Sequence, residues 1–443
     1  MLPLEFVKRM ENQLGLSESQ DFFNALNSPA PISIRINKQK FKNSLNLEKV
    51  KWSSDGYYLP SRPLFASDPL WHAGVYYVQE ASSMAIEQAF LAIKKSLKTN
   101  LKILDLCAAP GGKSTHLLNL MDVDDVLISN EVIQSRVGVL QENIRKSGYS
   151  NVVITNQDSS QFNNLKNYFD LVLVDAPCSG EGLFRKDIQA VQHWNDENLK
   201  TCELRQKRIL SDIIQSVKSG GYIIYSTCTF NPKENEAQLD YLISNGFEPV
   251  NFVINGKENY VHSFLPHQCV GEGFFIGLLK KTGWVNESEM FVKNKFTIEK
   301  VSQSYLKNQD QMLFVRNGNI KIGLTEATFK AINHLPFHLV SFGVECVEMK
   351  SQLELPKDYL AFSNDFNQSL FPVIDLDLKQ AINYISSQSI SIKLDWKGYI
   401  SLCFRGYVIG IGKSIGNRIN NLFPNPWKLK KEIKESEYFT LID

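Results

Sequence analysis

The sequence predicts an α/β protein built on a doubly wound, mostly parallel sheet, with a small α+β unit before the sheet and a β-rich module after it. Between residues 68 and 283, short apolar runs alternate with segments of helical period, which is typical of parallel strands joined by helices. Residues 1–67 contain one helix pattern and one strand-like run, and residues 319–443 alternate apolar runs with Gly and Pro turns. The predicted domains are 1–67, 68–283 and 371–443, with a linker and an intermediate module over 284–370.

The individual elements follow from apolar patterns taken in chain order. Ile32–Ile36 predicts a strand of the first unit. Five β-branched apolar runs predict buried strands of the central sheet: Leu101–Leu106, Val126–Glu131, Val152–Thr155, Leu171–Asp175 and Tyr222–Tyr225. Two helix faces lie between them, namely Val137, Leu140 and Ile144 closed by Gly148, and Leu210, Ile213, Ile214 and Val217 closed by Gly220. Residues 284–318 read as a polar linker, and Tyr399–Phe404 and Tyr407–Gly410 as strands of the last module.

Composition restricts the classes of protein that this chain can be. It has 443 residues, of which 43% are hydrophobic, enough for a sizeable core and about three domains. No apolar run approaches the roughly 18 residues of a membrane span, and charges come too early for a signal peptide. The 48 basic and 47 acidic residues give a net charge of +1, so any nucleic-acid surface must be a local concentration of charge.

The seven cysteines include no CxxC pair. An odd count without such pairs argues against a disulfide framework and against a zinc ribbon. It predicts reduced thiols, a cytoplasmic protein and no bound metal.

The turn after the first central strand is the first candidate site. Asp105–Thr115, with the letters DLCAAPGGKST, joins that strand to a helix, and its glycines let the backbone approach a ligand at the carboxyl edge of the sheet. A phosphate-binding P-loop needs Gly where Cys107 stands, and Pro110 removes one backbone donor, so this alternative is disfavoured. A plain strand-to-helix turn without a ligand stays open as the bland interpretation.

Acidic residues end the next two strands. Glu131 can accept hydrogen bonds from ribose hydroxyls, and Asp158, in the run Asn156–Asp158, can reach an adenine. Each acid taken alone is more often a solvated carboxylate. Together they outline a nucleoside across the strand ends. Because no GxGxxG is present, a nicotinamide or flavin is disfavoured, and S-adenosylmethionine fits best.

Two cysteines follow the fourth and fifth strands. Cys178 lies in Asp175–Gly182 and Cys228 in Ser226–Thr229, whereas Cys202 lies in a helix pattern and reads as structural. A thiolate that adds to carbon 6 of a pyrimidine makes carbon 5 nucleophilic enough to take a methyl group, and a nearby carboxyl can hold N3. A second thiol or a base could assist release.

These motifs together resemble the Sun/Nop family of RNA cytosine-C5 methyltransferases. The matching segments are SIRIN at 33–37, YYVQEASSMA at 76–85, CAAPGGKSTHLL from Cys107, NE at 130–131, VDAPCSGEGLFRKD at 174–187, YSTCTFNPKENE at 225–236 and PHQCVGEGFF at 266–275. The segment from Gly410 to Pro424 resembles the ribosomal small-subunit methyltransferase F branch, which carries a PUA-like RNA-binding module there. Ser263 and Asn420 depart from the residues common in relatives.

The resemblance implies a role for each matching position. Cys228 would be the nucleophile, Cys178 would assist product release, Asp175 would contact the base, and Lys113 would line the catalytic pocket. The implied cofactor contacts are Cys107, Ala108, Ala109, Pro110, Gly111, Gly112, Lys113, Glu131, Arg136, Asp158 and Asp175. The implied fold is a Rossmann-like methyltransferase sheet.

The expected function is S-adenosylmethionine-dependent methylation of cytosine C5 in 16S ribosomal RNA, by a monomer that binds RNA and no membrane. The alternatives are a transfer RNA substrate and an inactive RNA-binding assembly factor. Two sets of residues could contact the RNA, although a solvated face or core packing is the bland alternative for nearly all of them. The basic candidates are Arg185, Lys186, Arg205, Lys207, Arg208, Arg418, Lys428, Lys430, Lys431 and Lys434, and the stacking candidates are Phe184, Trp194 and Trp427.

Overall fold

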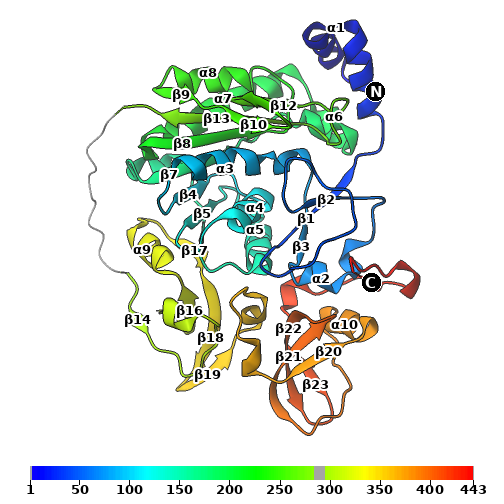
Figure 1. Cartoon of the computed structure of the whole chain (residues 1–443), viewed down its shortest axis with the longest axis vertical. Helices are drawn as coiled ribbons and strands as arrows, with labels where there is room; N and C mark the ends of the chain where they lie inside the picture. Colours follow the sequence, from blue (N-terminus) through cyan, green and yellow to red (C-terminus); the bar gives the residue numbers. More distant parts are fainter. Residues whose placement is uncertain (1, 284–294, 443) are drawn as a thin grey trace.

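A nine-stranded mixed sheet forms the centre of the molecule (Figure 1). The computed structural model describes residues 2–283 and 295–442. The strand order is β12-β13-β8-β7-β4-β5-β6-β17, and β9 also pairs with β13. The parallel strands are β4 (Lys102–Asp105), β5 (Val126–Asn130), β6 (Val152–Thr155), β7 (Phe169–Asp175) and β8 (Val217–Thr227). They confirm the five predicted strands.

Antiparallel strands extend this sheet at both edges. The β8 edge carries β13 (Phe274–Lys281), β12 (Val261–Phe264) and β9 (Phe247–Pro249), and the β6 edge carries β17 (Leu339–Phe342). A short hairpin, β10 (Phe252–Ile254) and β11 (Lys257–Asn259), lies outside the sheet.

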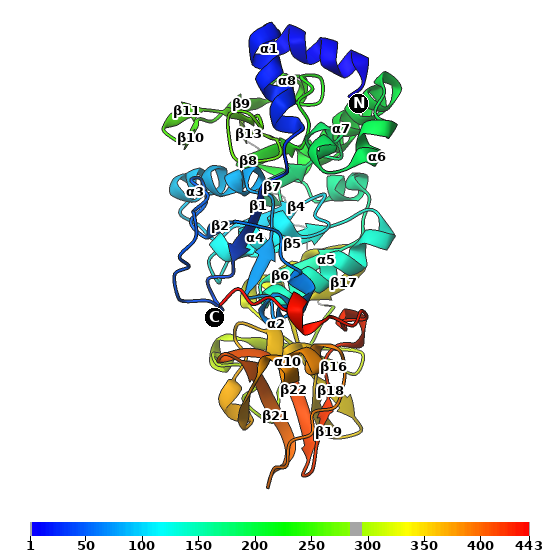
Figure 2. The same cartoon turned by 90° about the vertical axis from the view of Figure 1, so that its right-hand side faces the viewer.

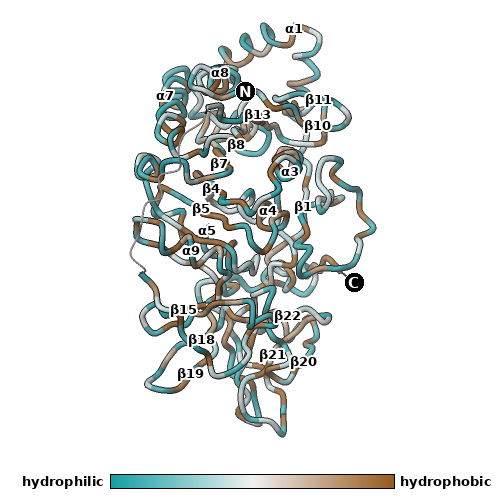
Figure 3. Tube along the Cα trace, turned by 60° about the vertical axis from the view of Figure 1, so that its left-hand side comes forward, coloured by the Kyte–Doolittle hydropathy of each residue, from teal (hydrophilic) through white to brown (hydrophobic). Residues whose placement is uncertain are grey.

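Helices cover both faces of the sheet, as the alternation of strands and helices predicts. On one face, α3 (Ile86–Ser96), α4 (Gly112–Leu120) and α5 (Gln134–Ser147) pack on Ile103. On the other face, α7 (Asp196–Ile213), α8 (Glu236–Ile243) and α9 (Glu326–His334) pack on Leu104. Hydrophobic stretches run along the central strands in Figure 3. None of the described helices is long and apolar enough to cross a membrane.

One of the two predicted helix ends is wrong. Gly148 ends α5 in the left-handed region, at φ 80°, as expected. Gly220 does not end a helix, because α7 finishes at Ile213 and Val217 already opens β8. Gly220 has φ 75° and lies where the pairing of β8 with β7 shifts register. The apolar face of α7 runs directly into an apolar strand, so periodicity alone does not show the boundary.

The first unit is larger than predicted. It contains the kinked helix α1 (Leu4–Leu26) and a sheet of order β2-β1-β3, formed by Ile32–Ile36 (β1), Gly56–Leu59 (β2) and Tyr76–Val78 (β3). The predicted boundary after residue 67 is therefore wrong, because β3 completes this sheet after the short helix α2 (Pro69–His72). A three-residue strand carries too little pattern to be found from sequence.

Residues 295–370 of the predicted linker and intermediate module do not form a separate module. Residues 284–294 lie outside the described part of the chain. The rest forms a sheet of β14 (Ile298–Glu299), β15 (Leu313–Asn317), β16 (Ile320–Leu324), β18 (Val344–Lys350) and β19 (Leu353–Pro356). However, α9 packs in the central core and β17 pairs with β6. Tertiary pairing with a distant strand determines this arrangement, which local patterns do not reveal.

The last module contains a four-stranded sheet and one α-helix. Its elements are β20 (Val373–Leu376), α10 (Leu378–Ile385), β21 (Lys397–Phe404), β22 (Tyr407–Ile415) and β23 (Ile419–Asn421). One hydrophobic cluster joins it to the first unit, with Ile34 and Leu70 on one side and Tyr384 and Leu402 on the other. Figure 2 shows the module, in orange and red, at the opposite end of the molecule from α1.

Candidate active site

A cavity of about 390 Å³ lies at the carboxyl ends of β4, β7 and β8. This volume falls in the range typical of small-molecule sites. Eight of the residues singled out in the sequence line it: Cys107, Ala108, Ala109, Pro110, Gly112, Lys113, Asp175 and Cys228. Because the carboxyl ends of neighbouring parallel strands meet at one edge, residues from three separate motifs converge there.

Three further segments complete the cavity wall. They are Tyr77–Glu80 with Ser83 from the first unit, the loop residues Gly182, Leu183 and Lys186, and Glu272–Phe274. Lys186 forms an ion pair with Glu272 at 2.5 Å. The motifs YYVQE and GEGFF contain most of these residues, but their role as walls depends on tertiary contacts between distant segments.

The two cysteines of the strand-end loops are neighbours. The Sγ atoms of Cys178 and Cys228 lie 3.3 Å apart. The hydrogen bond with Cys228, followed by burial, raises the pKa of Cys178 well above its usual range. Cys178 therefore keeps its proton and can donate its S–H to Cys228 Sγ. All seven cysteines of the chain are free thiols.

An ion pair lies beside the thiols. Lys113 Nζ is 2.8 Å from Asp175 Oδ2, and Asp175 Oδ1 accepts a hydrogen bond from Ser226 Oγ at 2.8 Å. Burial alone would lower the pKa of Lys113, but the neighbouring Asp175 carboxylate outweighs it and raises that pKa. Lys113 therefore stays charged and holds a carboxylate facing the same cavity as Cys228.

A buried polar network supports the thiol loops from behind. Glu234, completely buried, accepts hydrogen bonds from the Ser179 amide at 2.9 Å and from Ser179 Oγ at 2.6 Å. The hydroxyls of Ser179 and Thr229 lie 2.8 Å apart. Ser179 follows Cys178 and Thr229 follows Cys228, so this network ties together the residues next to each thiol.

Asp105, the first residue of the predicted turn Asp105–Thr115, provides a further polar group in the site. It is fully buried and lines the cavity, and its Oδ2 accepts a hydrogen bond from Ser114 Oγ at 2.6 Å. Its Oδ1 has no hydrogen-bond partner among the described residues. Burial raises the pKa of Asp105 to about 7. A cationic ligand in the cavity would supply what this carboxylate lacks.

Glu131 and Arg136 support the cofactor-loop motif rather than line the cavity. Glu131 is 2% exposed, and its carboxylate accepts hydrogen bonds from the amides of Ala109 at 3.3 Å and Ile133 at 2.8 Å. Arg136 donates to the Ala109 carbonyl. Gly111, at the start of α4, has φ 110°, a conformation that favours glycine.

Asp158 lies outside the cavity lining. It forms an ion pair with Arg208 at 3.1 Å. The structure thus brings the loop from Cys107 to Lys113 together with Asp175 and both thiols, whereas Glu131, Arg136 and Asp158 do not line this cavity.

The RNA-contact candidates divide into buried and exposed residues. Arg185 donates to the carbonyls of Ser28 at 3.0 Å and Gly271 at 2.8 Å. Phe184, Trp194 and Trp427 are each less than a tenth exposed and belong to hydrophobic clusters, so core packing is confirmed for them. The other basic candidates are exposed: Lys186, Arg205, Lys207, Arg208, Arg418, Lys428, Lys430, Lys431 and Lys434.

Family models match most of the chain. One for the 16S rRNA methyltransferase RsmB/F covers residues 92–280, which include the five parallel strands of the central sheet and most of the residues that line its cavity. The chain belongs to the RsmB/F methyltransferase family. It is therefore a methyltransferase. Models for the N-terminal domain of 16S rRNA methyltransferase RsmF and for the methyltransferase RsmF PUA domain match residues 2–81 and 371–429. The first of these ranges includes β3, as the observed sheet does.

Relatives of this family member match over nearly its whole length. Ribosomal RNA small subunit methyltransferase F of Vibrio vulnificus is 28% identical, covering 96% of this chain and 97% of that protein. The protein of the same name from Aliivibrio fischeri is 29% identical with the same coverage. Among solved structures, PH0851 aligns with a TM-score of 0.57 and 25% identity, covering 63% of this chain and 66% of that one. NSun6 from Pyrococcus horikoshii with SFG aligns with a TM-score of 0.53 and 20% identity, covering 63% of this chain and 98% of that one. This alignment supports the fold.

Proposed function

We propose that this methyltransferase transfers a methyl group from S-adenosylmethionine to carbon 5 of a cytosine in 16S ribosomal RNA, through a covalent adduct with Cys228. The observation that carries the proposal is the pair of thiols, with Sγ atoms 3.3 Å apart, beside the Lys113–Asp175 ion pair. Methyl transfer to a nucleophilic nitrogen or oxygen needs no protein thiol. Carbon 5 of a pyrimidine needs a thiolate at carbon 6 before it can react.

The residues around the cavity fit the cofactor. Asp105 presents a buried acceptor without a partner, which suits the ammonium of a methionine moiety. The backbone from Ala108 to Gly112 borders the same space, and Glu131 and Arg136 hold this loop in place. When bound, S-adenosylmethionine supplies an electrophilic methyl group.

The chain's own residues carry the remaining chemistry. As Cys228 Sγ bonds to carbon 6 of the cytosine, its thiol proton passes to the Asp175 carboxylate, which Lys113 holds, and from there to N3 of the ring. This addition places electron density on carbon 5. After methylation, the proton on carbon 5 leaves, the S–C6 bond breaks, the 5,6 double bond is restored, and the proton on N3 returns to the Cys228 thiolate.

The structure also suggests how Cys178 becomes a base for that proton. Its pKa is raised chiefly by the hydrogen bond with Cys228. Once Cys228 Sγ is bonded to the base, this interaction no longer favours the thiol form of Cys178. The pKa of Cys178 then falls, although burial and the Glu234 carboxylate still raise it, and the fraction of Cys178 present as thiolate accepts the carbon-5 proton.

The RNA substrate follows from the relatives' names and from the last module. Relatives across 96% of the chain are named for the small-subunit ribosomal RNA. In the last module, a group of exposed basic residues lies in the region that the PUA model covers and in the segment after it: Arg418, Lys428, Lys430, Lys431 and Lys434. Such side chains neutralise RNA phosphates. We assign RNA binding to this module, acting within a cytoplasmic monomer.

Bisulfite sequencing tests the proposal and separates the substrates. RNA from a wild-type strain and from a strain lacking this gene is compared, with a Cys228→Ser copy as the complementation control. The expected result is a 16S cytosine that is methylated in the wild type and unmethylated in the other two strains. If methylation is lost only from transfer RNA, transfer RNA replaces 16S RNA as the substrate. If no cytosine loses its methyl group in the deletion strain, the proposed activity is contradicted.

A further inference from the structure

A buried carboxylate bridges the two thiol-bearing loops. Glu181 is fully buried and lies three residues after Cys178 in the loop that follows β7. Its Oε2 accepts a hydrogen bond at 3.1 Å from the amide of Phe230, which lies two residues after Cys228. The next residue, Gly182, donates its amide to the Cys228 carbonyl at 2.8 Å. The two loops are thus bonded to each other directly beside both cysteines.

The counter-ion of this carboxylate comes from the opposite end of the sequence. Arg9 of α1 donates from Nη2 to Glu181 Oε1 at 2.7 Å, and Trp194 Nε1 donates to the same oxygen at 2.8 Å. Arg9 also lies against the rings of Phe6 and Trp194, at 5.4 and 5.8 Å. Without this cation, the charge of Glu181 would be enclosed in an aromatic cluster, which disfavours a carboxylate.

Two donor atoms of Arg9 are buried without a partner, which indicates that Arg9 lies there for its ion pair with Glu181. Its Nε and Nη1 atoms are buried and have no hydrogen-bond partner among the described residues. Burying such donors is unfavourable, and anchoring α1 to the rest of the protein does not require it, because Phe6, Met10 and Phe22 already bury that helix. Among the residues that the structure describes, Glu181 is the only one with which the Arg9 guanidinium forms an ion pair.

We infer that Glu181, neutralised by Arg9, is a positioning residue that sets the spacing of Cys178 and Cys228. The inference rests on the proposed roles of the two thiols. β7 and β8 end next to each other, paired as Asp175 with Ser226, but each cysteine lies beyond its strand end. The contact between the Ser179 and Thr229 hydroxyls joins the loops at the residues next to the cysteines, and a second, charged acceptor shared between the loops would fix their spacing. Glu181 supplies it, and Arg9 makes the α1 helix part of the active-site scaffold.

A trivalent arsenical measures this spacing directly. Phenylarsine oxide bonds to two thiols at once only when the sulfur atoms are neighbours, and a competing monothiol removes it from single cysteines. We would measure arsenical retention by intact mass, single-turnover methylation of 16S RNA, cofactor binding and melting for Glu181→Gln and Arg9→Met. Glu5→Gln is the matched control, because Glu5 is an exposed acid paired with Lys8 on the same helix. Cys178→Ala identifies the bridged pair.

The wild type and Glu5→Gln should retain the arsenical, and Cys178→Ala should lose it. Glu181→Gln should retain at least tenfold less arsenical than the wild type. It should also methylate 16S RNA about 100-fold more slowly, as expected when reacting groups are displaced. Cofactor binding should be unchanged, because Glu181 does not line the cavity. Arg9→Lys keeps the positive charge, so its arsenical retention and its methylation rate should lie between those of Arg9→Met and those of the wild type.

The inference is overturned if folded Glu181→Gln keeps either the arsenical or the methylation rate of the wild type. If Glu181→Gln alone fails to fold, the double variant Arg9→Met/Glu181→Gln removes both buried charges and should fold better. It must then show the same two losses. Arsenical retention requires neither RNA nor cofactor, so a wild type that bridges the arsenical without methylating RNA would contradict the proposed function alone.

Discussion

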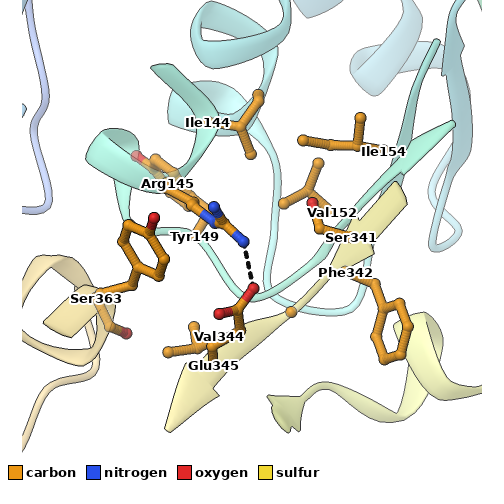
Figure 4. Close-up of a pocket in the computed structure, with 13 residues that line it drawn as sticks. Ile144, Arg145, Tyr149, Val152, Ile154, Ser341, Phe342, Val344, Glu345 and Ser363 are labelled. Carbon is orange, nitrogen blue, oxygen red and sulfur yellow. Dashed lines mark hydrogen bonds and ion pairs between the residues drawn. The ribbon is translucent and has the colours of Figure 1, made fainter. Parts of the chain in front are cut away.

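Two of the regions of this molecule that bury charged side chains differ in one respect: only one of the two surrounds a cavity large enough for a ligand. At the carboxyl edge of the sheet, Asp105, Lys113 and Asp175 line a cavity of about 390 Å³ together with Cys228. At the junction between α5 and the last modules, comparable charges pack against aromatic rings. Arg145 pairs with Glu345 (Figure 4). The guanidinium of Arg145 also lies 4.0 Å from the centre of the Tyr359 ring.

Lys146 shows how completely the junction is closed. It forms an ion pair with Glu142 and lies 4.7 Å from the ring of Trp71 and 5.2 Å from that of Trp427. Lys146 lines one void of about 30 Å³, and Arg145 lines another of about 30 Å³. Each has room for little more than a water molecule. Buried charge alone therefore does not indicate chemistry. At the junction it joins modules, whereas at the sheet edge it faces a space where a substrate fits.

The largest expected effect is at Cys228. Cys228→Ser should lower methylation roughly 10⁴-fold or more, because removal of a nucleophile leaves only binding and charge stabilisation. Transfer of labelled methyl groups to 16S RNA measures it. Cys202→Ser is the matched control, since Cys202 is a part-buried thiol on α7. Equal losses of methylation in both variants would mean that Cys228 has no role that distinguishes it from another part-buried thiol.

Cys178→Ala should block a later step. Without the second thiol, the adduct on Cys228 would form but its carbon-5 proton would be removed slowly, so protein bound covalently to RNA should accumulate. Denaturing gel electrophoresis detects this species. The double variant with Cys228→Ser should show none. If Cys178→Ala turns over at the normal rate, Cys178 does not remove the carbon-5 proton.

The pH dependence of cofactor binding should follow Asp105. Its carboxylate has a pKa of about 7 in the cofactor-free protein, and only the ionised form attracts a cation. Affinity should be full above pH 7 and should fall about tenfold for each pH unit below it. Calorimetry across pH 5.5–8.5 (about one and a half units to each side) tests this, and Asp105→Asn should bind weakly at every pH.

Asp105 also affects stability with a defined sign. Its pKa is raised from 3.8 to about 7 in the folded protein, so the folded state binds more protons than the unfolded state in that interval. The contribution of Asp105 to stability therefore falls as pH rises from 3.8 to about 7. Asp105→Asn should flatten this part of the profile of unfolding free energy against pH. An unchanged slope would contradict the assigned shift.

Substitutions at the junction should change the free energy of unfolding and should leave the methylation rate unchanged. Lys146→Met should lower the free energy of unfolding by about 1–3 kcal/mol, since it leaves Glu142 unpaired and removes a cation from between two rings. Lys330→Met is the matched control, because Lys330 forms an exposed pair of the same spacing with Glu326. Denaturant titration measures the change. A loss of methylation rate per folded molecule would break the distinction between the two regions.

The sequence predicted the sheet edge well because its information there is local. Asp175, Cys178 and Cys228 each follow an apolar run, and parallel strands bring such positions together. Glu181, Arg9 and the wall residue Glu272 were not assigned, because their roles depend on contacts across the chain. Arg9 and Glu181 lie 172 residues apart. The addition of β17 to the central sheet was missed for the same reason.

The most direct test of the central claim is the chemical identity of the adduct. Cys178→Ala protein is incubated with S-adenosylmethionine and 16S RNA, digested with protease and nuclease, and analysed by mass spectrometry. The account predicts a methylated cytosine nucleotide bonded to the sulfur of Cys228. A nucleotide bonded to another residue, or methylated RNA with no adduct at any thiol, would contradict it.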